Sequence, residues 1–265
     1  MVSEWVRYFR DADRPLEAMH AHFEHHAYHR HSHETYSFGV TESGAQSFTC
    51  RGGAHTSTTG MVMAFNPDEP HDGRAANGAG FTYRMVHIGP SLVEDVLTDR
   101  GGPAGLPLFA EPVIDDPALA RRLSRLHAAL AGPADPLRLD ELLAAAVLSL
   151  APRGTSAVGV PGGLARRVRS VLLEHYASPL TAGDLAAAAG SSRFAVYRAF
   201  TATYGLAPSD YQRQLRLRAA RRLLAAGHPA ALVAAEVGFA DQSHLTRWFV
   251  RAYGLTPAAY ARATS

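Results

Sequence analysis

The chain has 265 residues, enough for two domains, and its content of 47% hydrophobic and 19% charged residues is ordinary for a globular protein. The longest apolar run, residues 142–151, is interrupted by Ser149 and is too short to cross a bilayer, which argues against a membrane-spanning helix. The single cysteine, Cys50, excludes an intrachain disulfide, and the first residues contain no apolar signal run, so we expect a cytoplasmic protein without membrane association.

The net charge of +2 is distributed unevenly along the chain. Residues 1–162 contain 13 arginines and 19 acidic residues, which gives a net charge of −6. Residues 163–265 contain 13 arginines and only 5 acidic residues, which gives +8. A basic C-terminal part beside an acidic N-terminal part is the charge distribution expected when the C-terminal part binds a polyanion such as DNA.

Residues 17–88 are predicted to form short strands, because segments rich in aromatic, β-branched and apolar residues alternate with turn signals. The turn signals are Ser43-Gly44, Gly52-Gly53, Gly60 and a loop over residues 66–80. Several short strands that close on one another form a small antiparallel barrel with room for one small ligand. We therefore predict an α+β chain that begins with a β-barrel, with strands at residues 36–42, 46–51, 61–65 and 81–88.

Histidines are concentrated in this predicted barrel, since ten of the fourteen precede Pro90. Their spacing, together with that of nearby glycine and proline residues, resembles the two signature stretches of the cupin barrel: His31, His33 and Gly44, then Gly60, Pro67 and His71. The resemblance implies that the histidines face one cavity.

Three uses of the histidines are open. An organic effector could be bound by His31, His33, Tyr36 and His71, with Arg84 available to pair an effector carboxylate. Alternatively, the three imidazoles of His31, His33 and His71 could hold a divalent ion with waters, although the glutamate ligand of metal cupins has no well-placed counterpart here. The histidines could also have no ligand role. We expect an organic effector and no cofactor.

Two longer helices are predicted after the barrel, because Asp116-Pro117 and Asp135-Pro136 each place a capping acid before a proline at the first helical position. Leucines at helical spacing give both helices an apolar stripe that can pack against the barrel. Residues 152–163 are rich in glycine and proline and are predicted to be a linker. The linker would separate a sensor domain at residues 1–151 from a second domain at residues 164–265.

The second domain contains one motif twice, which indicates two like units. In each unit an alanine-rich helix (residues 181–188 or 230–237) is followed by a glycine turn and a second helix with a polar cap, and this order predicts a helix-turn-helix. Seven residues of the motif recur 49 positions later: Arg198, Phe200, Tyr204, Gly205, Leu206, Pro208 and Tyr211 match Arg247, Phe249, Tyr253, Gly254, Leu255, Pro257 and Tyr260.

The second helix of each unit is predicted to bury one face and expose the other. Phe200 lies on the apolar face of the first, and Phe249 repeats this position in the second. Arginine, glutamine and hydroxyl groups form hydrogen bonds with bases and phosphates, and aromatic rings supply flat apolar contacts. The opposite stripes carry such groups: Arg193, Phe194, Tyr197 and Arg198 in the first helix, and Gln242, Ser243, Thr246 and Arg247 in the second.

A helix over residues 209–226, about 27 Å long, is predicted to connect the two units and could hold them near the roughly 34 Å spacing of successive major grooves. Ser209 and Gln212 suggest a capping box at its start, and Gly227 marks its end. Its arginines are expected to contact phosphates or solvent rather than read bases: Arg213, Arg216, Arg218, Arg221 and Arg222.

With these motifs, residues 164–261 resemble the AraC/XylS family of bacterial transcription regulators. The resemblance implies two helix-turn-helix units joined by a long helix, with base contacts from the two exposed stripes. It also implies a cupin-like sensor domain and a homodimer whose seam is formed by helices that follow the barrel.

We therefore expect a one-component regulator that binds double-stranded promoter DNA under the control of a small-molecule effector, and contacts RNA polymerase if it is an activator. Two other functions are open. One is a metal-dependent cupin enzyme with a DNA-binding tail, which needs a complete metal shell and a catalytic acid or base. The other is a DNA-binding repressor whose barrel binds no ligand.

Overall fold

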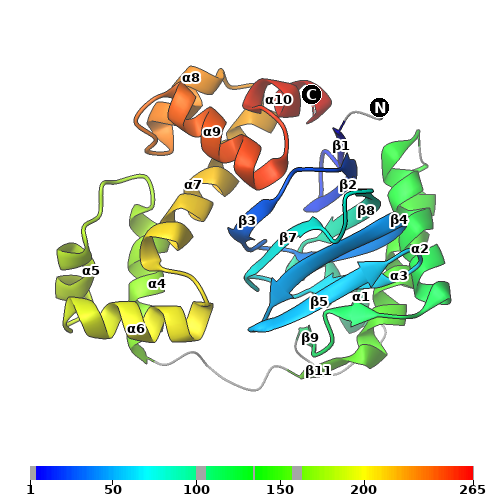
Figure 1. Ribbon diagram of the computed structural model, residues 1–265, viewed down its shortest axis with the longest axis horizontal. Helices are drawn as coiled ribbons and strands as arrows, with labels where there is room; N and C mark the ends of the chain where they lie inside the picture. The colour runs from blue at the N-terminus through cyan, green and yellow to red at the C-terminus, as the bar shows by residue number, and fades with distance from the viewer. Residues whose placement is uncertain (1–3, 100–105, 134, 157–162, 265) are drawn as a thin grey trace. The chain divides into compact units, whose positions relative to one another are not determined.

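The computed structural model describes residues 4–99, 106–133, 135–156 and 163–264. The chain divides into two compact units, Met1–Val158 and Gly159–Ser265 (Figure 1). No helix in the described part of the chain is both long enough and apolar enough to span a membrane.

The first unit contains a branched antiparallel sheet of nine described strands. Its main path runs β1-β2-β8-β4-β6-β10, and β5 and β7 pair with β4 while β3 pairs with β7. The strands are β1 (Trp5–Arg10), β2 (Leu16–Phe23), β3 (Tyr28–His31), β4 (Tyr36–Cys50), β5 (Gly53–Thr58), β6 (Val62–Phe65), β7 (His71–Ala75), β8 (Phe81–Ile88) and β10 (Val113–Ile114).

Strand β4 connects two layers of this sheet. Its first half pairs with β6 and β8, and its second half pairs with β5 and β7. The layers face each other, since the rings of Phe65 on β6 and His71 on β7 stack with centroids 3.8 Å apart. The predicted α+β fold with an N-terminal antiparallel sheet is therefore confirmed, but the sheet is an open sandwich whose main path ends at β1 and β10 and not a closed barrel.

The predicted turn at Ser43-Gly44 lies inside β4, where the pairing with β8 shifts register after Thr41. Gly44 has a φ of 72°, and a Cβ at this position would lie 2.1 Å from the carbonyl oxygen of Gly80. Only glycine fits both conditions. The glycine therefore bends one 15-residue strand between the layers instead of separating two strands.

Helix α1 (Pro90–Asp99) follows β8, whereas α2 (Pro117–Ala131) and α3 (Pro136–Leu150) follow β10, and α2 packs on β2, β4 and β8. The predicted caps are confirmed, because the Asp116 and Asp135 carboxylates accept backbone N–H bonds at the starts of α2 and α3. Tyr36, Phe38 and Val40 of β4 join the leucines of both helices in one core. Alternate residues of β4 therefore face the helices, and the residues between them face the interior of the sandwich.

The predicted linker over residues 152–163 is only partly a connection. Gly154–Ser156 forms strand β11, which pairs with β9 (Pro107–Phe109), and helix α4 already begins at Gly163. Residues 157–162 lie outside the described residues. Glycine content indicated a linker here, but pairing with a distant strand orders the first half of the segment.

The second unit consists of seven described helices, with α7 in contact with α4, α6, α8, α9 and α10 (Figure 1). The two predicted helix-turn-helix units are α5 with α6 and α8 with α9. Their turns pass through Gly190 and Gly238, whose φ angles are 61° and 86°. The helices are α4 (Gly163–His175), α5 (Ala182–Ala188), α6 (Arg193–Tyr204), α7 (Pro208–Ala225), α8 (Ala230–Glu236), α9 (Gln242–Tyr253) and α10 (Pro257–Thr264).

The repeated motif forms the same aromatic cluster twice. In the first unit, the ring centroid of Phe200 lies 4.7 Å from that of Tyr204 and 5.3 Å from that of Tyr211. In the second unit, Phe249 lies 4.6 Å from Tyr253 and 5.5 Å from Tyr260. The glycine of each motif ends its helix in the left-handed conformation, and the proline begins the next helix. The residues of the motif therefore pack together in the core of each unit, and this packing fixes the rotation of the second helix about its axis.

Candidate functional site

The first exposed stripe lies on α6, which begins after the cap formed by Ser192. Val196 and Phe200 are buried, as predicted, and this packing turns the opposite face of the helix outward. Phe194 and Tyr197 keep 80% and 55% of their surface exposed, which is unusual for large aromatic side chains. Arg193 and Arg198 are exposed beside them.

The second exposed stripe lies on α9, where the Asp241 carboxylate accepts the N–H of His244 and caps the first turn. Leu245 and Phe249 are fully buried. The four predicted contact residues therefore lie on the other face, with Gln242, Ser243 and Arg247 exposed and Thr246 partly exposed. Both stripes thus present hydrogen-bonding side chains at the first two turns of a helix that follows a glycine turn.

The arginines of α7 differ from the prediction, because several point into the domain and not toward solvent. Arg218 is buried, and Arg216 donates to the carbonyl oxygens of Tyr176, Ser178 and Gly238 at 2.6–2.9 Å. Arg213 pairs with Asp210 and lies 3.9 Å above the Trp248 ring, and Arg221 lies over the rings of Tyr253 and Tyr260. Of the five, only Arg222 is exposed.

The start of α7 also differs from the prediction. Ala207 occupies the cap position without a side-chain hydrogen bond. The Gln212 side chain donates to the carbonyl oxygens of Tyr176 and Ser178 instead of closing a capping box with Ser209. Gln212 and Arg216 therefore bind the same turn after α4, and α7 serves as the scaffold that connects the two helix-turn-helix units.

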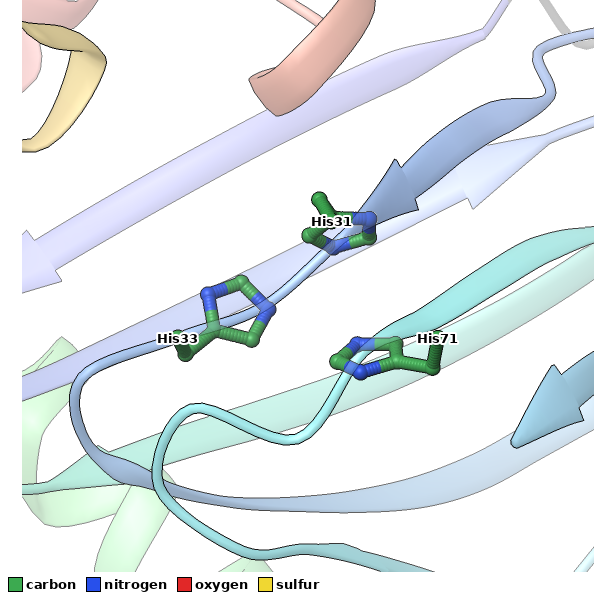
Figure 2. A group of neighbouring side chains, drawn as sticks. All are labelled: His31, His33 and His71. Atoms are coloured by element: carbon green, nitrogen blue, oxygen red, sulfur yellow. The ribbon is translucent and has the colours of Figure 1, made fainter. Parts of the chain in front are cut away.

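In the sandwich, three of the predicted ligand residues come together (Figure 2). His31 ends β3, His33 lies on the loop that follows, and His71 begins β7. One ring nitrogen from each of the three lies within 4.8 Å of the others. Among the described residues this is the only group of histidine, cysteine or acidic side chains with such a geometry.

The protonation of this cluster follows from its surroundings. His71 is 4% exposed, and burial together with the nearby His31 holds its pKa well below the ordinary value of 6.5. Burial also lowers the pKa of His87 to about 4. Both rings are therefore neutral at pH 7, the form in which an imidazole has one nitrogen lone pair that can accept a hydrogen bond or bind a cation.

His87 is a neighbour of the cluster that the sequence reasoning missed. It lies on β8, where it pairs with Ser37 of β4, and its Nδ1 is 2.8 Å from the Ser37 hydroxyl. Its ring centroid is 4.8 Å from that of His33. The alternation of side chains along a strand could have identified it. Tyr36 and Ile88 pack under the helices, so their neighbours Ser37 and His87 lie on the opposite face of the sheet.

Tyr36 and Arg84, which were predicted to bind the effector with the histidines, lie on the other face of the sheet. Tyr36 is fully buried in the core under α2 and α3, and its hydroxyl donates to the carbonyl of Pro107. Arg84 forms an ion pair with Glu42 at 2.7 Å. The helices cover this face, and for this reason the two side chains do not reach the interior of the sandwich.

Comparisons with known proteins fit both units. The family model described as the AraC-like ligand binding domain matches residues 15–147, about half of the chain, and a helix-turn-helix domain model matches residues 185–263. The chain belongs to the AraC family. It is 29% identical over 220 residues to the uncharacterized HTH-type transcriptional regulator YbfI of Bacillus subtilis (strain 168), covering 81% of this chain and 80% of YbfI.

Crystal structures of ToxT from Vibrio cholerae have the same fold. ToxT of strain O395 is similar with a TM-score of 0.59 at 10% identity, covering 99% of this chain and 98% of that chain. ToxT of strain SCE256 with a bound unsaturated fatty acid is similar with a TM-score of 0.58 at 12% identity, covering 98% of this chain and 95% of that chain. At this identity the likeness shows the fold alone. As a member of the AraC family, the chain is a DNA-binding transcription regulator with an AraC-type ligand-binding domain.

Proposed function

We propose that this AraC-family regulator reads promoter DNA through the exposed stripes of α6 and α9, and that a small molecule bound beside His31, His33 and His71 changes its DNA binding. The observation that carries the DNA part is the exposure of hydrogen-bonding side chains at equivalent places on both helices, on the face opposite the buried Phe200 and Phe249. Helices that enter a major groove contact base edges with residues of their first turns.

The two stripes combine two kinds of contact. Arg193, Arg198 and Arg247 carry a charge that attracts phosphates, whereas Gln242 and Thr246 are neutral and gain little from the phosphate field. The neutral side chains are therefore the better candidates for base discrimination. The net charge of +8 over residues 163–265 supplies the affinity that is independent of sequence.

The DNA contacts are tested with a duplex selected from a random library by the full-length protein. Gln242→Ala is expected to lose about 1–3 kcal/mol of preference at one base position, with little change on random DNA. Arg262→Ala is the control, because this exposed arginine lies on α10, outside both stripes. A Gln242→Ala protein that weakens equally on the selected duplex and on random DNA contradicts base reading by this residue.

The ligand part of the proposal is supported by three histidine side chains that converge between the two layers, with the buried His87 beside them. ToxT was crystallised with a fatty acid, but imidazoles favour a ligand with polar or metal-binding groups. We propose that the ligand shifts the sensor domain between two conformations, or two dimer geometries, that differ in DNA affinity. The sensor unit would then act on the DNA-binding unit without supplying any DNA contact itself.

A reporter gene under the native promoter, screened against small metabolites, tests this role. His33→Ala is expected to abolish the response to the active compound, while its DNA affinity without effector stays within about twofold of wild type, since the proposed DNA contacts lie in the other compact unit. His29→Ala, a change of an exposed histidine on the same strand, is the control. An undiminished response in His33→Ala would place the effector elsewhere.

A further inference from the structure

The ring nitrogens of His31, His33 and His71 are spaced closely enough for one ion. Three nitrogens bound to a tetrahedral Zn²⁺ at about 2.0–2.1 Å lie roughly 3.3 Å apart. The ligand atoms lie at most 4.8 Å apart, so each pair must approach by at most about 1.5 Å to bind one ion. Rotation of the imidazole rings can supply this movement. Figure 2 shows the three rings turned toward a common point from two separate segments of the chain.

Backbone carbonyls settle the tautomers of two of the rings. His71 Nδ1 lies 2.9 Å from the carbonyl oxygen of Glu69, and His31 Nδ1 lies 2.7 Å from that of His29. A carbonyl oxygen only accepts, so each Nδ1 carries the hydrogen and each Nε2 is left with its lone pair. Metal-binding histidines are commonly oriented by this kind of bond on the nitrogen that does not bind the metal.

Packing holds the buried ring in place as well. His71 stacks on Phe65 with parallel rings at 3.8 Å, and the centroid of His31 lies 4.5 Å from that of His71. These ring contacts, with the centroid of His33 at 5.3 Å, keep His71 beside the other two imidazoles.

We propose that His31, His33 and His71 bind a divalent transition-metal ion such as Zn²⁺, and that the ion presents an open coordination position to the effector. This inference rests on the proposed function in placing the ion at the ligand-sensing site. No carboxylate belongs to the cluster within the described residues, so its three imidazoles add no negative charge to the ion. An effector with an anionic donor group therefore suits the open position.

Titration of the metal-free full-length protein with Co²⁺, followed by visible absorption, tests the proposal. We expect one ion per chain with the absorption of a nitrogen-bound tetrahedral or five-coordinate site, and calorimetry with Zn²⁺ should give the same stoichiometry. His33→Ala should weaken binding at least about tenfold, a typical loss for a perturbed metal shell. His33 is only partly buried, so the variant should fold even if changes at buried His71 prevent folding.

His29→Ala is the matched control, since it removes an exposed imidazole from the same strand but keeps the backbone carbonyl that His31 uses. The proposal is overturned if the wild-type protein binds no Co²⁺, or if His33→Ala and His29→Ala bind it equally. The reporter response to the effector, measured beside the Co²⁺ titration, separates the two proposals. A protein that binds no Co²⁺ but still responds to the effector through His33 refutes the metal site alone, whereas a protein that binds Co²⁺ but responds equally in wild type and His33→Ala refutes the sensing role alone.

Discussion

Replacing Arg216 with methionine tests whether α7 connects the two helix-turn-helix units through the hydrogen bonds of this side chain. The guanidinium donates to Tyr176 and Ser178, which lie between α4 and α5, and to Gly238 in the turn of the second unit. Hydrogen bonds from a charged group contribute about 1.5–3 kcal/mol each. Methionine keeps the aliphatic stem, so packing is largely retained.

The expected loss is smaller than the sum of three such bonds. Arg216 is half-buried, and water can reach part of the carbonyl oxygens that it leaves. Taking about 1 kcal/mol for each bond, we expect the free energy of unfolding of the C-terminal unit to fall by about 3 kcal/mol. With a urea dependence of about 1.5 kcal/mol per molar, the midpoint shifts by roughly 2 M.

Tryptophan fluorescence during urea unfolding measures this loss. The chain contains two tryptophans, so Trp5→Phe leaves Trp248 on α9 as the single reporter of the C-terminal unit. Arg166→Met on α4 is the control, because this exposed arginine should change stability by less than about 0.5 kcal/mol. If Arg216→Met is as stable as the control and instead lowers the salt dependence of DNA binding, Arg216 contacts phosphate and the hydrogen-bond argument is wrong.

Three further outcomes follow from the same structure. Gly238→Ala should destabilise the C-terminal unit by several kcal/mol in the same urea assay, because the φ of Gly238 is 86° and a Cβ would lie 2.1 Å from the carbonyl oxygen of Ala177. Gly190 has open space around it, so Gly190→Ala should cost only about 1 kcal/mol. Phe194→Ala should weaken DNA binding in a gel shift while the urea midpoint stays unchanged, since this ring is 80% exposed. Burial, with Arg84 and His20 nearby, lowers the pKa of His127 from 6.5 to about 4. The neutral ring therefore contributes about 3 kcal/mol of stability above pH 6.5, and this contribution is lost as the pH falls toward 4. When the urea midpoint is measured as a function of pH, His127→Leu should show a smaller decrease between pH 6.5 and 4 than the wild-type protein. An unchanged profile in the variant would show that other groups cause the acid sensitivity.

The two helix-turn-helix units were predictable because their determinants are local. A helical period of 3.6 residues puts Val196 and Phe200 on one face and Phe194 and Tyr197 on the other, whatever the rest of the chain does. Polar caps and glycine turns are also read over a few residues. The charge difference between the two halves then distinguishes a polyanion-binding face from an ordinary solvated one.

Side chains whose partners are distant in sequence were less predictable. The sequence shows arginines spaced along α7, but their long side chains reach carbonyls in the turn after α4 and rings on α9 and α10 that only the folded domain brings near. We predicted that they contact phosphates or solvent, since an arginine on an amphipathic helix usually lies on the surface. Tertiary packing made several of them structural.

By itself, the sequence determined the family, the order of the two domains and the two exposed stripes, because repeats, caps and helical faces depend on residues that are close together along the chain. The tertiary structure decided which face of the sandwich receives each side chain of its strands. Helices α2 and α3 cover one face, and this places Tyr36 in their core and Arg84 beside Glu42. The histidines come from strands and a loop up to 56 residues apart, so only the bend of β4 between the layers and the pairing of β3 with β7 could bring His31, His33, His71 and His87 together.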